Sequence, residues 1–319
     1  MNRQATATAS QNRVTEQQQL IGAVLDQLNE IILGKDHQLR LALTCLLARG
    51  HLLIEDLPGV GKTTLAHALA RTLGLDYNRI QFTSDLLPAD VIGVSVYLRD
   101  DNRFEFHPGP IFSQVVLADE VNRATPKAQS ALLEAMEENQ VSADGNSYPL
   151  PDPFFVIATQ NPVTHIGTYP LPESQLDRFL MRISLGFPGP EMERRLIAGQ
   201  DRRELLSLLE PALQTEQLKS LMDAVPSIHV SDVLLDYVQA LVAFTRESPD
   251  FVHGLSPRAA ISIVKCSRSW AMIHGHPGVL PEDVQAIIPA VANHRLRLRD
   301  ELQAGSEPGE LMLAAVSVP

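Results

Sequence analysis

Apolar residues recur along the chain in two patterns, and these patterns predict the elements of the fold. From Glu16 onward leucine, isoleucine and valine return at the three- and four-residue spacing of a helix, and a second such stretch begins at Asp36 and stops at Gly50. Short strand-like runs, most of them largely apolar, occupy residues 51–55, 79–82, 115–119, 154–158 and 181–185. Because strands alternate with helices or loops, we expect an α/β domain with a mainly parallel five-stranded sheet.

The pattern changes at residues 186–190, where two glycines and two prolines in five residues favour a linker. Beyond it only helical spacing is found, and helices are expected at 191–201, 215–224, 231–246, 257–274 and 281–292. The sequence thus predicts an α/β domain at 15–187 and a smaller all-helical domain at 188–303. Residues 1–14, rich in Gln, Thr, Ser and Ala, are expected to form a disordered tail, whereas residues 304–319 give no clear signal.

Residues 56–64, DLPGVGKTT, nearly match the phosphate-binding pattern G-x-x-x-x-G-K-[ST], with Asp56 in place of the first glycine. They follow an apolar run and precede a helix expected at 62–73, which is the strand–loop–helix context of this motif. We expect Lys62 to reach the outer phosphates of a nucleotide and the Thr63 hydroxyl to bind Mg²⁺. Asp56 is expected to point away from the ligand. The loop residues expected to wrap the phosphates are Pro58, Gly59, Val60, Gly61, Lys62, Thr63 and Thr64.

The run VVLADE, residues 115–120, ends an apolar strand with two carboxylates. Asp119 is a candidate Mg²⁺ ligand, mostly through water, and Glu120 is a candidate for orienting or deprotonating an attacking water. Two solvated acids at a strand end are the structural alternative. A dedicated hydrolytic acid favours an ATPase over a small-molecule kinase, because a kinase must suppress attack by water. No N-K-x-D or T-K-x-D guanine signature occurs.

Three further polar residues are candidates for the same chemistry. Asn161 follows the run 154–158 and can contact the γ-phosphate or the lytic water if that strand lies beside the one that precedes the phosphate loop; an Asn-Pro turn is the alternative. Arg178 is a candidate finger that reaches the γ-phosphate of another subunit, or else a partner in a structural ion pair. Arg258 follows Ser256 and Pro257 in the first turn of an expected helix, which aims it from the helical domain towards a cleft.

In this order and spacing, these elements resemble the AAA+ ATPases, and GVGKT, LADEVNRA, ATQNP, GTYPLPESQLDRF and GLSPRA are similar specifically to the MoxR family over residues 20–300. The resemblance implies a P-loop AAA+ core followed by a helical lid domain. It assigns Lys62 and Thr63 to Walker A, and Asp119 and Glu120 to Walker B. It further assigns Asn161 to sensor 1, Arg178 to the arginine finger and Arg258 to sensor 2.

The resemblance also implies a function and its partners. Family members form ring hexamers, bind ATP with Mg²⁺ between subunits, and remodel or activate client proteins, often together with a von Willebrand factor A domain protein. We therefore expect a Mg²⁺-dependent ATPase of chaperone type. A nucleic-acid-remodelling ATPase and a regulatory scaffold that binds ATP in order to assemble are the alternatives.

Composition narrows these alternatives. The net charge is −12 across 319 residues, so nucleic acid is not expected as a partner. A local basic channel is still possible at this net charge. Two distant cysteines suggest neither a disulfide framework nor a zinc site. The polar N-terminus has no apolar segment of a signal peptide, and no run of 18 apolar residues occurs, so we expect a cytoplasmic protein.

Overall fold

A computed structural model gives the fold of the chain and describes residues 2–162, 168–199, 202–299 and 307–318. Its centre is a parallel five-stranded sheet with the strand order β2-β5-β8-β1-β9. These strands are β1 (Leu52–Glu55), β2 (Tyr77–Gln81), β5 (Val115–Asp119), β8 (Phe155–Gln160) and β9 (Met181–Ile183). The α/β class and the five-stranded sheet predicted from the apolar runs are confirmed.

Side chains of the central strands alternate between two hydrophobic cores. Leu52 and Ile54 of β1 belong to one core, whereas Leu53, between them, belongs to the other. This is the two-residue period of a strand whose faces are both covered, and it explains why the runs read as uniformly apolar. The first core continues into the helices of the second half of the chain, so the lid packs on that face of the sheet. The second core contains residues of α5.

The helices around the sheet are α1 (Asn2–Ile31), α2 (Asp36–Leu47), α3 (Lys62–Thr72), α4 (Pro88–Ile92), α5 (Pro126–Glu138) and α6 (Glu173–Leu176), with a 3-10 turn η1 (Val121–Arg123). The tail expected over residues 1–14 differs from the structure, where α1 already begins at Asn2. Residues 2–14 contain neither glycine nor proline, so no strong helix breaker separates them from the amphipathic stretch that follows, and their alanine, glutamine and arginine residues favour a helix.

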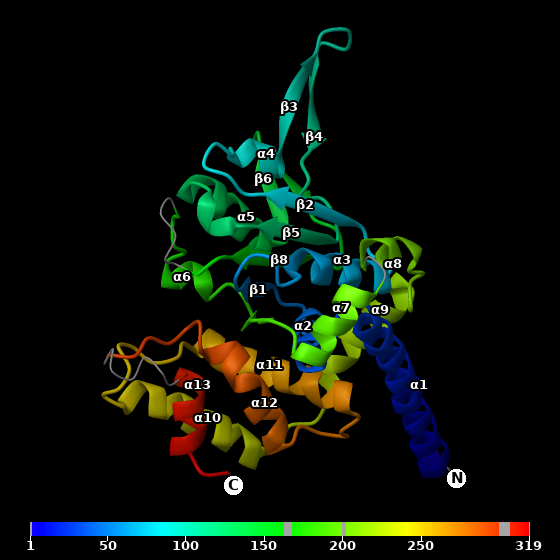
Figure 1. Ribbon diagram of the computed structural model, residues 1–319, viewed down its shortest axis with the longest axis vertical. Helices are drawn as coiled ribbons and strands as arrows, with labels where there is room; N and C mark the ends of the chain where they lie inside the picture. Colours follow the sequence, from blue (N-terminus) through cyan, green and yellow to red (C-terminus); the bar gives the residue numbers. More distant parts are fainter. Residues whose placement is uncertain (1, 163–167, 200–201, 300–306, 319) are drawn as a thin grey trace.

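Two β-hairpins are attached to the core. The pair β6 (Gln140–Ala143) and β7 (Asn146–Pro149) is joined by Asp144 and Gly145, both with positive φ, the conformation that an Asp-Gly turn between two strands favours. The second hairpin, β3 (Gly93–Leu98) and β4 (Arg103–Pro108), was not predicted. It projects from the core on the side away from the lid, at the top of Figure 1. Phe104 on β4 is 71% exposed, so no buried face marked this segment in the sequence.

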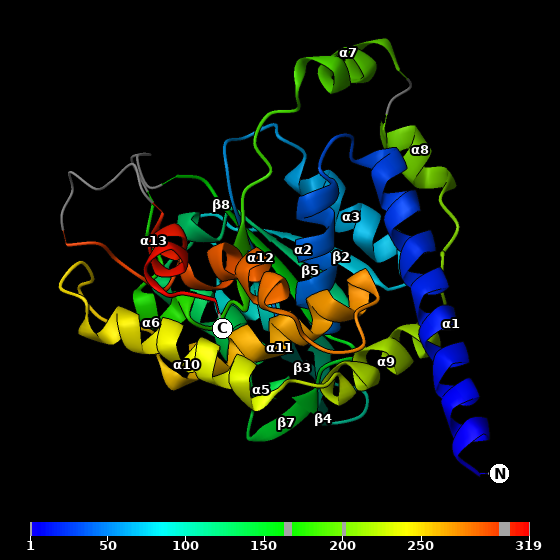
Figure 2. The ribbon, with the colours of Figure 1, turned by 90° about the horizontal axis from the view of Figure 1, so that it is seen from below.

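Among the described residues of the second half every helix or strand element is a helix, as predicted. The bounds are α7 (Pro190–Ala198), α8 (Arg202–Leu208), α9 (Thr215–Ala224), η2 (Val225–Ser227), α10 (Asp232–Glu247), α11 (Pro257–His274), α12 (Pro281–Ala292) and α13 (Pro308–Ala315). Residues 200–201 of the helix expected at 191–201, and 304–306 and 319 of the C-terminal tail, lie outside the described residues. The N-caps Ser231 and Ser256 accept hydrogen bonds from the first turns of α10 and α11. Helices α10 to α13 lie together below the sheet (Figures 1 and 2).

Candidate functional site

The phosphate loop connects the carboxyl end of β1 to the N-terminus of α3. Gly59 and Gly61 have φ angles of 87° and 98°, a left-handed conformation that glycine adopts without strain. A Cβ atom built on either glycine meets no other atom within 4 Å, so the loop borders open space. The first N–H groups of α3 have no partners inside their own helix and are available to an anion. The shape of the loop is compatible with a phosphate chain, and the binding role of Pro58 to Thr64 stays a prediction.

Lys62 lies at the centre of this site. The residue is only 7% exposed, and Nζ lies 2.5 Å from the Asp56 carbonyl oxygen and 3.1 Å from Oδ1 of Asn161. Burial lowers the pKa of Lys62, although the charges of Asp56, Asp119 and Glu120 act in the opposite direction. The ammonium is thus held between the phosphate loop and the end of β8, where negative phosphate oxygens would be its natural partners.

Asp119 ends β5 and is held by two neighbouring strands. Its Oδ1 accepts a hydrogen bond from the Thr159 hydroxyl at 2.6 Å, and its Oδ2 accepts one from the Arg79 guanidinium at 2.6 Å. Sequence reasoning missed Arg79 and Thr159. The alternation of Arg79 and Gln81 in β2 was the available signal, because side chains two residues apart in a strand share one face of the sheet.

Glu120 follows Asp119 in a left-handed conformation, with φ 56° and ψ 47°. This conformation is uncommon for a residue other than glycine and ends the strand. Asn161 donates from Nδ2 to Glu120 at 3.0 Å and accepts from Lys62 at Oδ1, so its amide bridges the Glu120 carboxylate and the Lys62 ammonium. The strand β8 does lie beside β1, which was the condition for Asn161 to reach the site. Gln81, at 3.2 Å, and Arg123, at 3.1 Å, also contact Glu120.

A divalent cation would need ligands beyond the protein. Among the described residues no three His, Cys, Asp or Glu side chains form a cluster able to hold a metal ion. Asp119 and the exposed Thr63 hydroxyl at the start of α3 fit Mg²⁺, which keeps much of its water and is commonly shared with nucleotide phosphates. The donor set is therefore suitable for magnesium brought with a nucleotide.

The aspartate that replaces the first glycine of the motif has a structural partner. The Asp56 carboxylate accepts hydrogen bonds from the backbone N–H groups of Leu57, Leu185 and Gly186, and from the Ser184 hydroxyl. Burial alone would raise the pKa of Asp56, but these hydrogen bonds outweigh burial and lower it. The carboxylate thus ties the phosphate loop to the linker that leads to the lid, which agrees with the expectation that it points away from the ligand.

Arg178 and Arg258 lie together but far from the phosphate loop of their own chain. Arg178 stands just before β9, and the cavity that it shares with Arg258 is also lined by Gly50 and His51, just before β1. This is the amino-terminal edge of the sheet, whereas Lys62 and Asn161 lie at the carboxyl-terminal edge. A four-residue strand separates these edges by about 13 Å. Arg258 does lie in a cleft, but that cleft is not the one beside its own phosphate loop.

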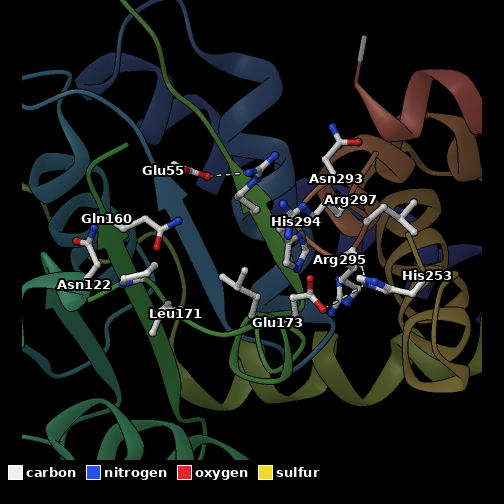
Figure 3. Close-up of a pocket in the computed structure, with 14 residues that line it drawn as sticks. Glu55, Asn122, Gln160, Leu171, Glu173, His253, Asn293, His294, Arg295 and Arg297 are labelled. Atoms are coloured by element: carbon white, nitrogen blue, oxygen red, sulfur yellow. Dashed lines mark hydrogen bonds and ion pairs between the residues drawn. The ribbon is translucent and has the colours of Figure 1, made fainter. Parts of the chain in front are cut away.

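A separate cleft of about 270 Å³ lies between core and lid (Figure 3). Glu55, at the carboxyl end of β1, lines it but is occupied by an ion pair with Arg182 at 2.7 Å. Glu55 is therefore not a free base.

Asp177, beside Arg178, pairs with the nearly buried Arg295 of the lid, also at 2.7 Å. The lid is therefore fixed to the segment that carries Arg178.

Within the described residues, no helix combines the length and apolar character that crossing a bilayer requires. Residues 51–181 match the ATPase family associated with various cellular activities (AAA), and residues 243–313 match the AAA lid domain. These two matches correspond to the sheet with its phosphate loop and to the later lid helices.

Several proteins are similar over most of their length. YeaC of Bacillus subtilis is 44% identical over 94% of this chain and 95% of its own. The chaperone MoxR1 of Mycobacterium tuberculosis is 40% identical over 91% and 79%, and MoxR of Paracoccus denitrificans is 35% identical over 85% and 86%. A crystal structure from Cytophaga hutchinsonii has a TM-score of 0.87 at 34% identity, covering 98% of this chain and 99% of that one. The chain belongs to the MoxR family of AAA ATPases, which bind nucleotide.

Proposed function

We propose that the protein hydrolyses ATP with Mg²⁺ at the interfaces of a ring of identical subunits, and that hydrolysis drives remodelling or activation of client proteins. The observation that carries the proposal is the separation of two half-sites within one chain. One half-site lies at the carboxyl-terminal edge of the sheet and consists of Lys62, Asp119, Glu120 and Asn161. Arg178 lies at the amino-terminal edge of the sheet. A second copy of the chain would bring the two halves together.

The residues of the first half-site have separate roles. Lys62 and the loop from Pro58 to Thr64 hold the phosphate chain, while Thr63 and Asp119 would hold Mg²⁺, which supplies positive charge beside the phosphates. Glu120 takes a proton from, or orients, the attacking water, and Asn161 fixes the position of Glu120 through their 3.0 Å hydrogen bond. Lys62, Asn161 and Glu120 are joined by hydrogen bonds, which fix the relative positions of the three side chains before attack.

The second half-site comes from the neighbouring subunit. Arg178 and Arg258 provide planar, permanently charged donors that stabilise the charge developing on the γ-phosphoryl group. A hexamer is the ring size that the family resemblance implies. Because MoxR1 is named a chaperone, we infer protein clients, with a von Willebrand factor A domain protein as one candidate partner. The net charge of −12 disfavours the nucleic-acid alternative.

Mixing two inactive variants tests the shared site. Glu120→Gln should bind ATP without turnover, and Arg178→Ala should bind ATP but hydrolyse it about 10³-fold more slowly. In rings assembled from equal amounts of both, half of the sites have Glu120 and half of those face an intact Arg178, so about a quarter of wild-type turnover should return. No recovery in verified mixed rings would refute catalysis between subunits.

Client remodelling needs a separate test. The Glu120→Gln variant should hold ATP and its client longest, so affinity capture with this variant in the presence of ATP should retain proteins that the Lys62→Ala variant releases. Identical captured proteins with both variants would contradict ATP-dependent client binding. A salt titration with DNA separates the nucleic-acid alternative, since binding that weakens steeply with salt would favour it.

A further inference from the structure

One carboxylate joins the two arginines of the second half-site. Glu137 stands in the last turn of α5, and its Oε2 lies 2.5 Å from Nη1 of Arg178. Its other oxygen, Oε1, accepts a hydrogen bond from Nη2 of Arg258 at 2.6 Å. Each carboxylate oxygen therefore serves one guanidinium, and the two arginines come from different domains: Arg178 from the core and Arg258 from α11 of the lid.

The three side chains stand at an accessible surface. Exposed side-chain fractions are 33% for Glu137, 31% for Arg178 and 53% for Arg258, beside a cavity of about 310 Å³. The hydrogen bond from Arg258, together with the charges of both arginines, lowers the pKa of Glu137, which keeps it ionised at neutral pH. The group can therefore meet another molecule without unfolding either domain.

The α5 helix connects this group to the hydrolytic acid of the same chain. At its start, Gln129 donates hydrogen bonds to the carbonyl oxygens of Val121 and Ala124, in the segment that follows Glu120. At its end, Arg178 also donates to the Leu133 carbonyl at 2.8 Å, one turn before Glu137. One rigid helix of about 20 Å thus contacts both the segment beside Glu120 and the two arginines.

Resting on the proposed function, we propose that Glu137 is a positioning residue that holds Arg178 and Arg258 side by side for the nucleotide of the adjacent subunit. Two guanidinium groups repel each other, and the shared carboxylate removes that repulsion while fixing their separation. Within one subunit, α5 holds the segment beside Glu120 and the two arginines in fixed relative positions. Glu137 itself does not touch the substrate.

Replacing Glu137 by glutamine isolates this role. Glutamine keeps the size of the side chain but has one acceptor oxygen and one NH₂ donor, so one arginine loses its partner. We expect kcat for ATP hydrolysis to fall about 10- to 100-fold, because small displacements of catalytic groups have effects of this size. The KM for ATP should change less than about twofold, since Lys62 and the phosphate loop are untouched. Glu137→Asp, which keeps the charge on a shorter side chain, should retain more activity.

Glu138→Gln is the matched control, because Glu138 is the next residue of the same helix and its side chain is exposed. It should leave kcat unchanged. An unchanged or increased kcat in Glu137→Gln, or a loss equal to that of Glu138→Gln, would overturn the proposal. If Glu137→Gln does not fold, Glu137→Asp is compared with Glu138→Asp in the same assay, and equal kcat values would overturn it.

Mixed rings separate this proposal from the function on which it rests. A Glu137→Gln subunit keeps its own Glu120, so a Glu120→Gln neighbour with correctly held arginines should restore about a quarter of wild-type turnover. If turnover recovers when Glu120→Gln is mixed with Arg178→Ala but not when it is mixed with Glu137→Gln, the proposed role of Glu137 is overturned and the shared active site is not. Recovery with neither variant would overturn the shared active site, and this inference with it.

Discussion

Replacing Asp56 by glycine, which would complete the common phosphate-loop pattern, should destabilise the protein. Asp56 as a whole residue is 8% exposed, and its carboxylate accepts four hydrogen bonds. Two of them, from the backbone N–H groups of Leu185 at 2.7 Å and Gly186 at 2.6 Å, come from the linker to the lid. In the Asp56→Gly variant these two donors lose their acceptor in a region that is largely shielded from water.

The magnitude follows from these two contacts. Removing a charged acceptor from a shielded N–H lowers stability by about 1.5–2 kcal/mol per donor, and glycine adds roughly 0.5–1 kcal/mol of backbone entropy in the unfolded chain. The donors Leu57 and Ser184 are closer to solvent and contribute little to this sum. We therefore expect the free energy of unfolding to fall by about 3.5–5 kcal/mol.

Urea unfolding followed by circular dichroism measures this change. Asp56→Asn should lie between wild type and Asp56→Gly, because the amide keeps one acceptor oxygen without the charge. Asp236→Asn, at an exposed position of α10, controls for the loss of a negative charge and should unfold like wild type. If Asp56→Gly proved as stable as wild type to within 1 kcal/mol, or more stable, the assignment of Asp56 as the anchor of the linker would be wrong.

Three further predictions concern other parts of the molecule. Lys62→Ala should abolish ATP binding in a fluorescent-nucleotide titration while the thermal unfolding midpoint stays near wild type, and retained affinity would contradict the assigned phosphate site. Burial lowers the pKa of His51 from 6.5 to about 4, so stability should be lost as pH falls through this range, by about 3 kcal/mol in total. Urea midpoints should depend less on pH in His51→Gln, and an equal dependence would reject the assignment. Phe155→Ala, in the buried strand β8, should lower stability by about 3–5 kcal/mol in the same assay, whereas a loss below 1 kcal/mol would mean that the core repacks.

Much of the fold could be predicted because its signals are local. The strand β5 was predicted with its bounds because its first four residues are apolar and Asp119 ends it, and α11 because Ser256 and Pro257 define its start. The β3–β4 hairpin could not be predicted in this way. Tyr97 and Phe104 are aromatic but exposed, so the segment has no buried face to produce a regular alternation.

Some residues of the candidate site could likewise be predicted from local sequence, and others could not. Spacing along the chain was enough to select Lys62, Glu120 and Asn161, because parallel strands place their carboxyl ends at one edge of a sheet. Spacing could not reveal that Arg79 holds Asp119, or that Asp56 binds the linker more than 120 residues later. Those contacts depend on which strands become neighbours.

The sequence by itself determined the elements, the phosphate loop and the family resemblance, since propensity, burial and motif chemistry are properties of residues near one another in the chain. Only the tertiary structure decided that Arg178 and Arg258 share Glu137 at the edge of the sheet opposite to their own phosphate loop. The physical reason is that a side chain's partners are set by strand order and by lid docking. Both are the result of burying apolar surface across the whole molecule, and no short stretch of sequence records them.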